Sequence, residues 1–79
     1  MNYYQRLKDI REDADLKQVE VAEILGIKQT HYSRYERGAQ MMGIDKYIKL
    51  ARYYNVSLDY IAGLIDEPLS LTERKKMHV

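Results

Sequence analysis

The chain has 79 residues, 13 lysines and arginines against 12 aspartates and glutamates, and no cysteine. This length permits one small domain, and the lack of cysteine excludes a disulfide framework and a thiolate metal site. The net charge of +1 excludes a generic polycation, so any binding to nucleic acid depends on where the basic residues lie. The N-terminus lacks the apolar core of a signal peptide, and no apolar run reaches membrane-spanning length. We therefore expect a cytoplasmic protein without membrane association.

The first predicted helix begins after Asn2, which forms a capping pair with Gln5 three residues later. Its apolar stripe recurs at helical spacing and consists of Tyr3, Leu7, Ile10 and Ala14. The charged residues between them predict a solvated face: Arg6, Lys8, Asp9, Glu12 and Asp13. Asp15 stands at the helix exit, where glycine fits more easily, and Leu16 returns the chain to the core.

Residues 18–38 predict two short helices joined by a tight turn. The apolar face of the first comprises Val19, Val21, Ala22, Ile24 and Leu25. Gly26 readily takes the positive φ of a sharp helix exit, and Ile27 fills the turn. The small side chain of Ala22 lets the next helix cross close by. The inward residues of that helix, residues 28–37, are Tyr32, Tyr35 and Glu36. This spacing is typical of a helix-turn-helix, whose second helix lies in a DNA major groove.

This region resembles the phage Cro and repressor (XRE-like) family of helix-turn-helix proteins. The residues that carry the resemblance are Gln18, Ala22, Leu25-Gly26-Ile27, Ser33-Arg34-Tyr35-Glu36, Gly38, Leu50-Ala51 and Asn55-Val56-Ser57-Leu58-Asp59-Tyr60. The match covers roughly residues 5–64, which makes it more specific than one amphipathic helix pair. It implies an all-α, compact five-helix domain similar to that of lambda repressor, which binds double-stranded DNA in a sequence-specific manner.

The family pattern pairs Arg11, on the inner half of the first helix, with Glu36. Such an ion pair contributes more to the orientation of the helices than to net stability, because burying two charges costs about what their attraction returns. The alternative is an ordinary exposed arginine.

Lysines occupy the cap positions of both motif helices, Lys17 and Lys28. A missing cap costs about 1 kcal/mol, and a cation opposes the helix dipole. Both positions suit contacts with DNA phosphates; the alternative is that both lysines extend into water. The resemblance adds Gln18, Arg37 and the loop after Gly38, whose bare backbone amides could approach a phosphate.

The outward face of residues 28–37 carries the predicted base-reading residues: Gln29, Thr30, Ser33 and Arg34. Glutamine can bond adenine through two hydrogen bonds, arginine can do the same with guanine, and threonine can contact a thymine methyl group. Any surface helix presents a polar face, so it is the family placement that favours DNA contact. His31 has no second ligand in sight, and we interpret it as a bystander or a phosphate contact rather than a metal ligand.

After Gly38, Met41 and Met42 are expected to fill gaps in the core. Gly43 caps a fourth helix that runs to about Tyr54, with predicted buried residues Ile44, Tyr47, Ile48, Leu50 and Ala51. Asn55 ends this helix. Ser57 caps a fifth helix with Tyr60 and Ile61 inward, and Gly63 closes it.

Residues 1–66 are expected to form the DNA-binding domain and residues 67–79 a tail. The capping-box pattern Ser70-Leu71-Thr72-Glu73 suits a short last helix through Met77; a frayed tail is the alternative. The fifth helix and the residues after it carry more apolar side chains than one small core can bury. We expect some of them to form a two-fold contact: Tyr60, Leu64, Ile65, Leu69 and Leu71.

The sequence thus predicts a transcriptional regulator of repressor type that binds a palindromic operator as a homodimer, with half-sites about 34 Å apart. No carboxylate pair, metal cluster, nucleophile-base arrangement or phosphate loop occurs at a recognisable spacing, which argues against an enzyme, and no cofactor is implied. The other alternative is a protein-interaction module, such as an antitoxin or adaptor. The basic face that carries Gln29 and Arg34 disfavours this as the sole function.

Overall fold

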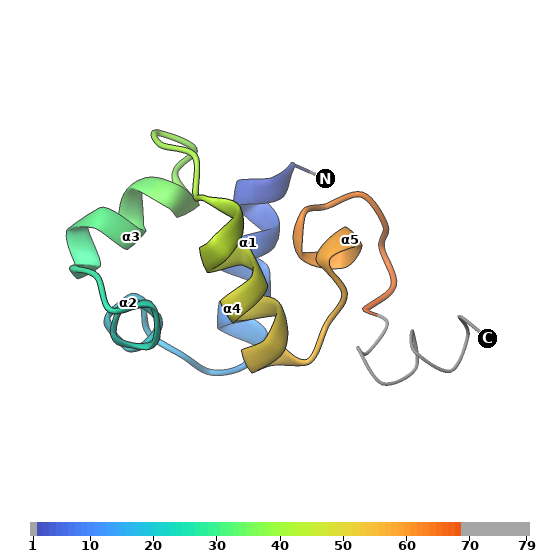
Figure 1. Cartoon of the computed structure of the whole chain (residues 1–79), viewed down its shortest axis with the longest axis horizontal. Helices are drawn as coiled ribbons and strands as arrows, with labels where there is room; N and C mark the ends of the chain where they lie inside the picture. Colours follow the sequence, from blue (N-terminus) through green and yellow to red (C-terminus); the bar gives the residue numbers. More distant parts are fainter. Residues whose placement is uncertain (1, 69–79) are drawn as a thin grey trace.

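The computed structural model describes residues 2–68 of the chain. In that range the elements are α1 (Tyr3–Asp13), α2 (Gln18–Leu25), α3 (Gln29–Glu36), α4 (Ile44–Tyr54) and α5 (Leu58–Ile61), which confirms the all-α, five-helix expectation. In Figure 1, α2 and α3 lie on one side of α1 and α4, and α5 lies on the other. The predicted last helix through Met77, and the apolar residues Leu69 and Leu71, lie outside the described residues.

Short polar side chains and left-handed residues set several helix ends. The side-chain oxygen of Asn2 accepts the backbone N–H of Gln5 at 2.8 Å, and the hydroxyl of Ser57 accepts the N–H three residues later at 3.1 Å. Both predicted N-caps are therefore confirmed. At the C-terminal ends of α1 and α4, Asp15 (φ 57°) and Asn55 (φ 56°) adopt the left-handed conformation, which aspartate and asparagine enter more readily than most other residues.

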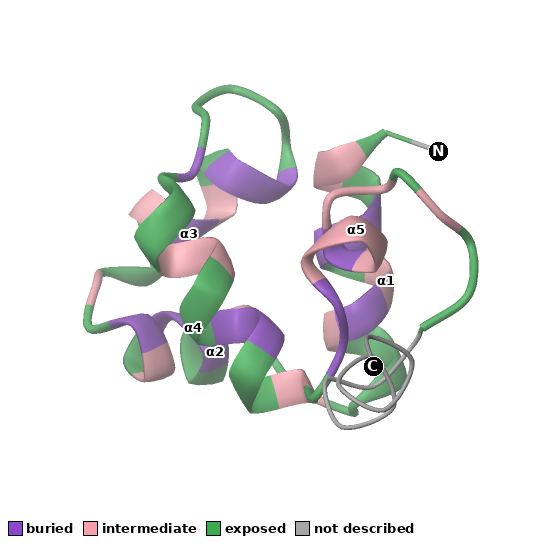
Figure 2. Cartoon of the chain, turned by 45° about the vertical axis from the view of Figure 1, so that its right-hand side comes forward, coloured by how far each residue is buried: buried purple, intermediate pink, exposed green. Residues whose placement is uncertain are grey.

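The core takes side chains from all of these helices and from the turns between them. Its buried apolar residues are Leu7, Ile10, Val21, Ala22, Leu25, Tyr32, Tyr35, Met42, Leu50, Ala51, Val56 and Ile61. Figure 2 shows the buried segments in purple on the inward sides of the helices. The core therefore connects α2 and α3 to the rest of the domain, and its packing fixes the position of these two helices.

Five residues that the apolar pattern assigns to the core are exposed: Ala14, Val19, Met41, Ile44 and Ile48. On α4, Leu50 and Ala51 define the buried side, and Ile44 and Ile48 lie on a neighbouring stripe one turn apart. Val19 lies on the side of α2 that faces away from the core. The prediction was wrong at these positions because a domain of this size cannot cover all of its apolar residues.

Arg6 shows the opposite error. The charge pattern places it on the solvated face of α1, but the structure leaves only 3% of it exposed. It lies one turn before Ile10, beside the apolar stripe. Its guanidinium donates hydrogen bonds to the backbone carbonyls of Tyr60 and Ile65, at 2.7 and 2.9 Å. Those distant carbonyls satisfy the buried charge, and the local sequence gives no sign of them.

Gly26 follows α2 and Gly38 follows α3, and both have the same backbone conformation. Comparing alanine substitutions at the two positions therefore tests the packing around Gly38. Gly26 (φ 71°) and Gly38 (φ 72°) are both left-handed, but a Cβ at Gly26 would meet nothing within 4 Å, whereas one at Gly38 would lie 2.8 Å from the ring of Tyr4. Gly26→Ala should cost about 1 kcal/mol for the strained φ. Gly38→Ala should cost about 1 kcal/mol more, since the Tyr4 ring must also move. Denaturant unfolding measures both changes, and equal losses would show that the ring yields freely.

Candidate nucleic-acid interface

The turn between α2 and α3 has the tight geometry that the spacing predicts. Gly26 adopts the left-handed conformation at φ 71°, and the N–H of Ile27 donates to the carbonyl of Ala22 at 3.0 Å. Ala22 is buried, at 1% exposed, so the two helices approach each other over a methyl group. The predicted helix-turn-helix is confirmed.

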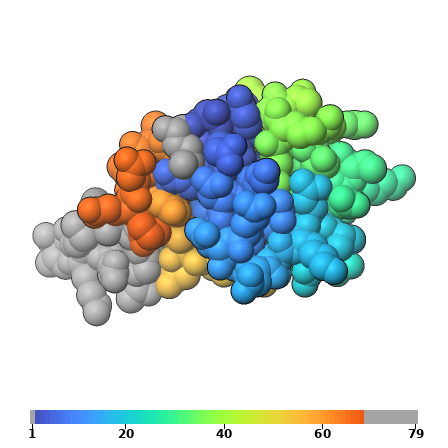
Figure 3. Space-filling view, turned by 180° about the vertical axis from the view of Figure 1, so that it is seen from behind, coloured from blue at the N-terminus to red at the C-terminus, as the bar shows by residue number. Residues whose placement is uncertain are grey.

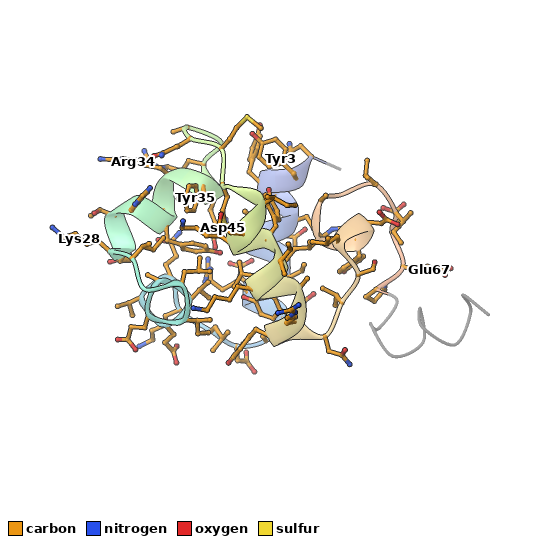
Figure 4. All side chains as sticks on the ribbon, viewed as in Figure 1. Tyr3, Lys28, Arg34, Tyr35, Asp45 and Glu67 are labelled. Atoms are coloured by element: carbon orange, nitrogen blue, oxygen red, sulfur yellow. The ribbon has the colours of Figure 1, made fainter. Side chains whose placement is uncertain are left out.

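α3 separates a buried side from an exposed side. Its buried residues are Tyr32, Tyr35 and Glu36. Of the predicted base-reading residues, Gln29, Thr30 and Arg34 are exposed and Ser33 is half-buried. In Figure 4, the labelled side chains of Lys28 and Arg34 point outward from the edge of the domain at which α3 lies. The accessible side is therefore polar and carries basic residues.

Lys17 and Lys28 occupy the cap positions of α2 and α3, as predicted, and neither side chain caps its helix. At α2 the carboxylate of Glu20 accepts the backbone N–H of Lys17 at 2.9 Å. At α3 the first turn carries no acidic residue, so no carboxylate offsets the positive end of that helix dipole. The surface around Lys28 is therefore the more favourable of the two for an external anion.

Arg11 and Glu36 form the predicted ion pair through two hydrogen bonds. Nε of Arg11 donates to Oε2 of Glu36 at 2.7 Å and Nη2 donates to Oε1 at 3.1 Å. The two side chains are 11% and 3% exposed. Nη1 of Arg11 donates to the carbonyl of Leu16 at 2.9 Å. These bonds fix α1 to the C-terminal end of α3 and to the turn before α2.

The environment of the pair favours the charged form of both groups. Burial raises the pKa of the Glu36 carboxyl, but hydrogen bonds from Arg11 and Gln18 lower it by more, so the net pKa lies below its ordinary value of 4.5. The hydrogen bond with Glu36 raises the pKa of the Arg11 guanidinium.

This lowered pKa predicts that the Glu36 carboxylate stabilises the fold at neutral pH and loses that contribution in acid. The unfolded chain binds the proton more tightly than the folded chain, so stability falls as the pH drops from 4.5 through the folded pKa. Unfolding of the wild type and of Glu36→Gln across the acidic range tests this. We expect the difference in stability between them to shrink below pH 4.5. A constant difference would mean that the charge of the carboxylate contributes nothing.

Gln18 connects the buried ion pair to the exposed end of α3, a role that the sequence did not reveal. Its side-chain nitrogen donates to Oε1 of Glu36 at 3.0 Å, and its side-chain oxygen accepts from Nε2 of Gln29 at 3.2 Å. The one sequence feature that pointed to this role is that a glutamine is the first residue of both α2 and α3. One N–H of the Gln18 amide is thus used internally, and its second N–H is the group that could reach a phosphate.

The backbone N–H groups of Gly38, Ala39 and Gln40 are used inside the protein. The N–H groups of Ala39 and Gln40 both donate to the carbonyl of Arg34, at 2.9 and 3.3 Å, and the N–H of Gly38 donates to that of Tyr35 at 3.2 Å. These bonds close the C-terminal end of α3. The N–H groups of Gly38, Ala39 and Gln40 are therefore not bare, and a phosphate contact by the rest of this loop stays a prediction. The exposed side chain of Arg37 is a further candidate phosphate contact at this end.

His31 has an internal partner that the sequence did not predict. Its Nε2 lies 3.1 Å from the hydroxyl of Tyr35, one turn later on α3. His31 is half-buried beside this contact. Residues 2–68 contain no group of three or more His, Cys, Asp or Glu side chains placed to hold a metal ion, and none of their helices has the length and apolar character to cross a membrane.

Comparison with known proteins agrees with this geometry. A family model described as helix-turn-helix matches residues 7–61. The chain belongs to the Cro and repressor (XRE-like) helix-turn-helix family. It is a DNA-binding domain of the type that transcriptional regulators carry, and not an enzyme.

Three relatives of this helix-turn-helix chain illustrate the family. It is 41% identical over 75 residues to the uncharacterized HTH-type transcriptional regulator YobD of Bacillus subtilis, covering 95% of this chain and 67% of YobD. It is 41% identical over 63 residues to the HTH-type transcriptional regulator ImmR of the same species, covering 80% of this chain and 50% of ImmR. It is 30% identical over 74 residues to the cryptic phage CTXphi transcriptional repressor RstR of Vibrio cholerae, covering 94% and 65%.

A solved structure shares the fold. A transcriptional regulator from Listeria innocua superposes with a TM-score of 0.77 at 25% identity, covering 96% of this chain and 71% of that one. The chain thus spans between 50% and 71% of the length of these proteins, and each relative extends beyond the part that is matched here.

Proposed function

We propose that this domain reads a specific duplex sequence by placing α3 in the major groove, as part of a transcriptional regulator of repressor type. The observation that carries the proposal is the hydrogen bond from Gln29 to Gln18, which holds an exposed amide at the N-terminal end of α3 in one orientation. The N-terminal residues of a recognition helix are those that reach base edges. The regulators and the phage repressor among the relatives support the repressor assignment.

The orientation of the Gln29 amide follows from the buried charge behind it. A carboxylate only accepts hydrogen bonds, so the amide nitrogen of Gln18 must face Glu36 and its oxygen must face Gln29. Gln29 then donates one N–H to that oxygen and keeps its second N–H and its own oxygen for the groove. These are the two groups that bond N7 and the amino group of adenine.

The other assignments divide between bases and phosphates. Arg34 suits guanine, and Thr30 suits a thymine methyl group. Ser33 is half-buried and reaches a base with only part of its surface. Phosphate contacts are assigned to three basic residues, Lys17, Lys28 and Arg37. The second N–H of the Gln18 amide is assigned to a phosphate as well. We place its site of action in the cytoplasm, since the relatives are transcriptional regulators of bacteria.

We further propose that two copies bind a palindromic operator, with Tyr60, Leu64 and Ile65 at the contact between them. Leu64 is 76% exposed, a large unburied apolar side chain in the segment after α5. Leu64→Asp should abolish a weak dimer that light scattering detects in the wild type at high concentration, while the binding of one copy to a single half-site stays unchanged. A wild type that is monomeric both free and on its operator would contradict the dimer.

Selection of bound sequences from a random duplex pool tests the main proposal. The expected result is an enriched palindrome whose half-sites are separated by about one helical turn. Gln29→Ala, selected in parallel, should lose preference at one position of each half-site. If no sequence is enriched, the domain does not read DNA sequence and the protein-interaction alternative gains support.

A further inference from the structure

The buried Arg6 fixes the segment after α5 to α1. Its Nη1 donates to the carbonyls of Tyr60 and Ile65, at 2.7 and 2.9 Å, and its Nη2 donates to the carboxylate of Asp66 at 3.3 Å. The guanidinium carbon lies 4.1 Å from the centroid of the Tyr60 ring, within cation–π range. One side chain therefore holds both ends of residues 60–66, a part of the chain more than 50 residues away in sequence.

This segment has little intrinsic structure of its own. α5 has four residues, too few to be stable in isolation, and residues 62–68 form no helix. Ile61, at 0% exposed, anchors α5 in the core, and Gly63 turns the chain at φ 82°. Beyond Gly63, Arg6 supplies the hydrogen bonds at Ile65 and Asp66. The N–H of Leu64 donates to the carbonyl of Asp59 in α5 at 2.9 Å, so it is the conformation of residues 65 and 66 that depends on α1.

The held segment carries the surface that we assign to the dimer contact. Figure 3 shows residues 60–66 in orange packed beside α1 in blue. In the sequence, the exposed Leu64 lies between Tyr60 and Ile65, the two residues whose carbonyls accept hydrogen bonds from Arg6. Arg6 therefore acts together with the hydrogen bond from Leu64 N–H to the carbonyl of Asp59: it holds Tyr60 before Leu64 and Ile65 after it, and so restricts the direction in which the Leu64 side chain projects.

We propose that Arg6 is a positioning residue for the association of two copies of this chain: it orders residues 60–66 so that Leu64 projects as a preformed contact. The inference rests on the proposed dimer. Preordering a contact segment strengthens association because less conformational freedom is lost on binding. Arginine suits this role because Nη1 bonds both carbonyls while Nη2 bonds the carboxylate of Asp66 and the planar group lies over the Tyr60 ring, whereas lysine offers a single nitrogen.

Arg6→Lys tests the inference, with Arg52→Lys as the matched control on the exposed face of α4 and Leu64→Asp as the reference for a lost contact. Three quantities are measured: amide hydrogen exchange across residues 60–66, the dimer dissociation constant by sedimentation, and affinity for a duplex with a single half-site. Arg6→Lys should speed exchange in residues 60–66 by about tenfold and weaken the dimer by about tenfold. Half-site affinity and exchange in α2 and α3 should stay at wild-type values, and Arg52→Lys should change nothing.

The opposite outcomes overturn the inference. If Arg6→Lys dimerises like the wild type, Arg6 does not position the contact. If half-site affinity falls by the same factor as dimerisation, Arg6 is a general stabiliser of the fold. Should the lysine variant fail to fold, Arg6→Gln, which buries no charge and reaches fewer acceptors, is judged by the same measurements. A wild type that never dimerises, with Leu64→Asp equally monomeric, places the failure in the proposed dimer rather than in Arg6.

Discussion

Replacing Arg11 with alanine is expected to lower the free energy of unfolding by about 3 kcal/mol, because the change strands a buried carboxylate. Glu36 is 3% exposed at its side chain and accepts both hydrogen bonds of the pair. Without Arg11 it retains the N–H of Gln18, which bears no charge. The carbonyl of Leu16 loses its donor as well. Chemical denaturation of the purified domain measures the loss.

The double change Arg11→Met and Glu36→Leu should cost less than Arg11→Ala alone, since neither charge then remains to be buried. Arg52→Ala is the control. It removes an exposed arginine from α4 and should change stability by no more than about 0.5 kcal/mol. Small and additive losses from Arg11→Ala and Glu36→Ala would show that the two side chains do not meet in solution.

Replacing Gln29 with alanine should cost about 1–3 kcal/mol on the preferred operator and little on random DNA, because it removes a base contact. Gln40→Ala is the matched control, since that glutamine is also exposed but lies in the loop after α3. Gln18→Ala should lose part of the same discrimination, because it frees the Gln29 amide to rotate. Salt titrations on operator and non-operator duplexes measure each variant. An unchanged ratio of specific to non-specific affinity in Gln29→Ala would refute base reading through this residue.

Lys28→Ala should behave differently, because a phosphate contact releases counterions from every duplex alike. Binding should weaken on operator and random DNA by the same factor, and the salt slope should fall by about one unit. Arg34→Ala should lose both discrimination and some salt dependence. If Lys28→Ala changes the specificity ratio and leaves the salt slope intact, the roles of Lys28 and Gln29 are assigned the wrong way round.

Local patterns were sufficient to predict the helices and the two sides of α3. Asn2, Gly26 and Ser57 act through atoms a few residues away, so the sequence predicts the helix ends they form. Tyr32 and Tyr35 sit at helical spacing, and their large rings decide which side of α3 is buried. The Arg11–Glu36 pair required the family pattern, because nothing in the local sequence relates residues 25 positions apart.

Other features depend on tertiary contacts that no local pattern encodes. Arg6 is buried only because the carbonyls of Tyr60 and Ile65 reach it. Ile44 is exposed because it lies on a stripe of α4 beside the buried one, which the apolar pattern did not separate from the core side. The orientation of Gln18 follows from a carboxylate on another helix. In each case the sequence shows whether the side chain is polar or apolar, but contacts with residues far away in the sequence decide whether it is buried and how it is oriented.

The hydrogen-bonded series from Arg11 through Glu36 and Gln18 to Gln29 has a consequence for how new operator preferences could arise in this family. Thr30 and Arg34 are exposed, so if they read bases as proposed, exchanging them should alter recognition at little cost to the fold. Gln29 is the exposed end of this hydrogen-bonded series, whose other end is the buried ion pair. A substitution of Gln29 removes the hydrogen bond that the side-chain oxygen of Gln18 accepts. Mutation should therefore diversify positions 30 and 34 readily, while a lasting change at position 29 is expected to require a second substitution at position 18.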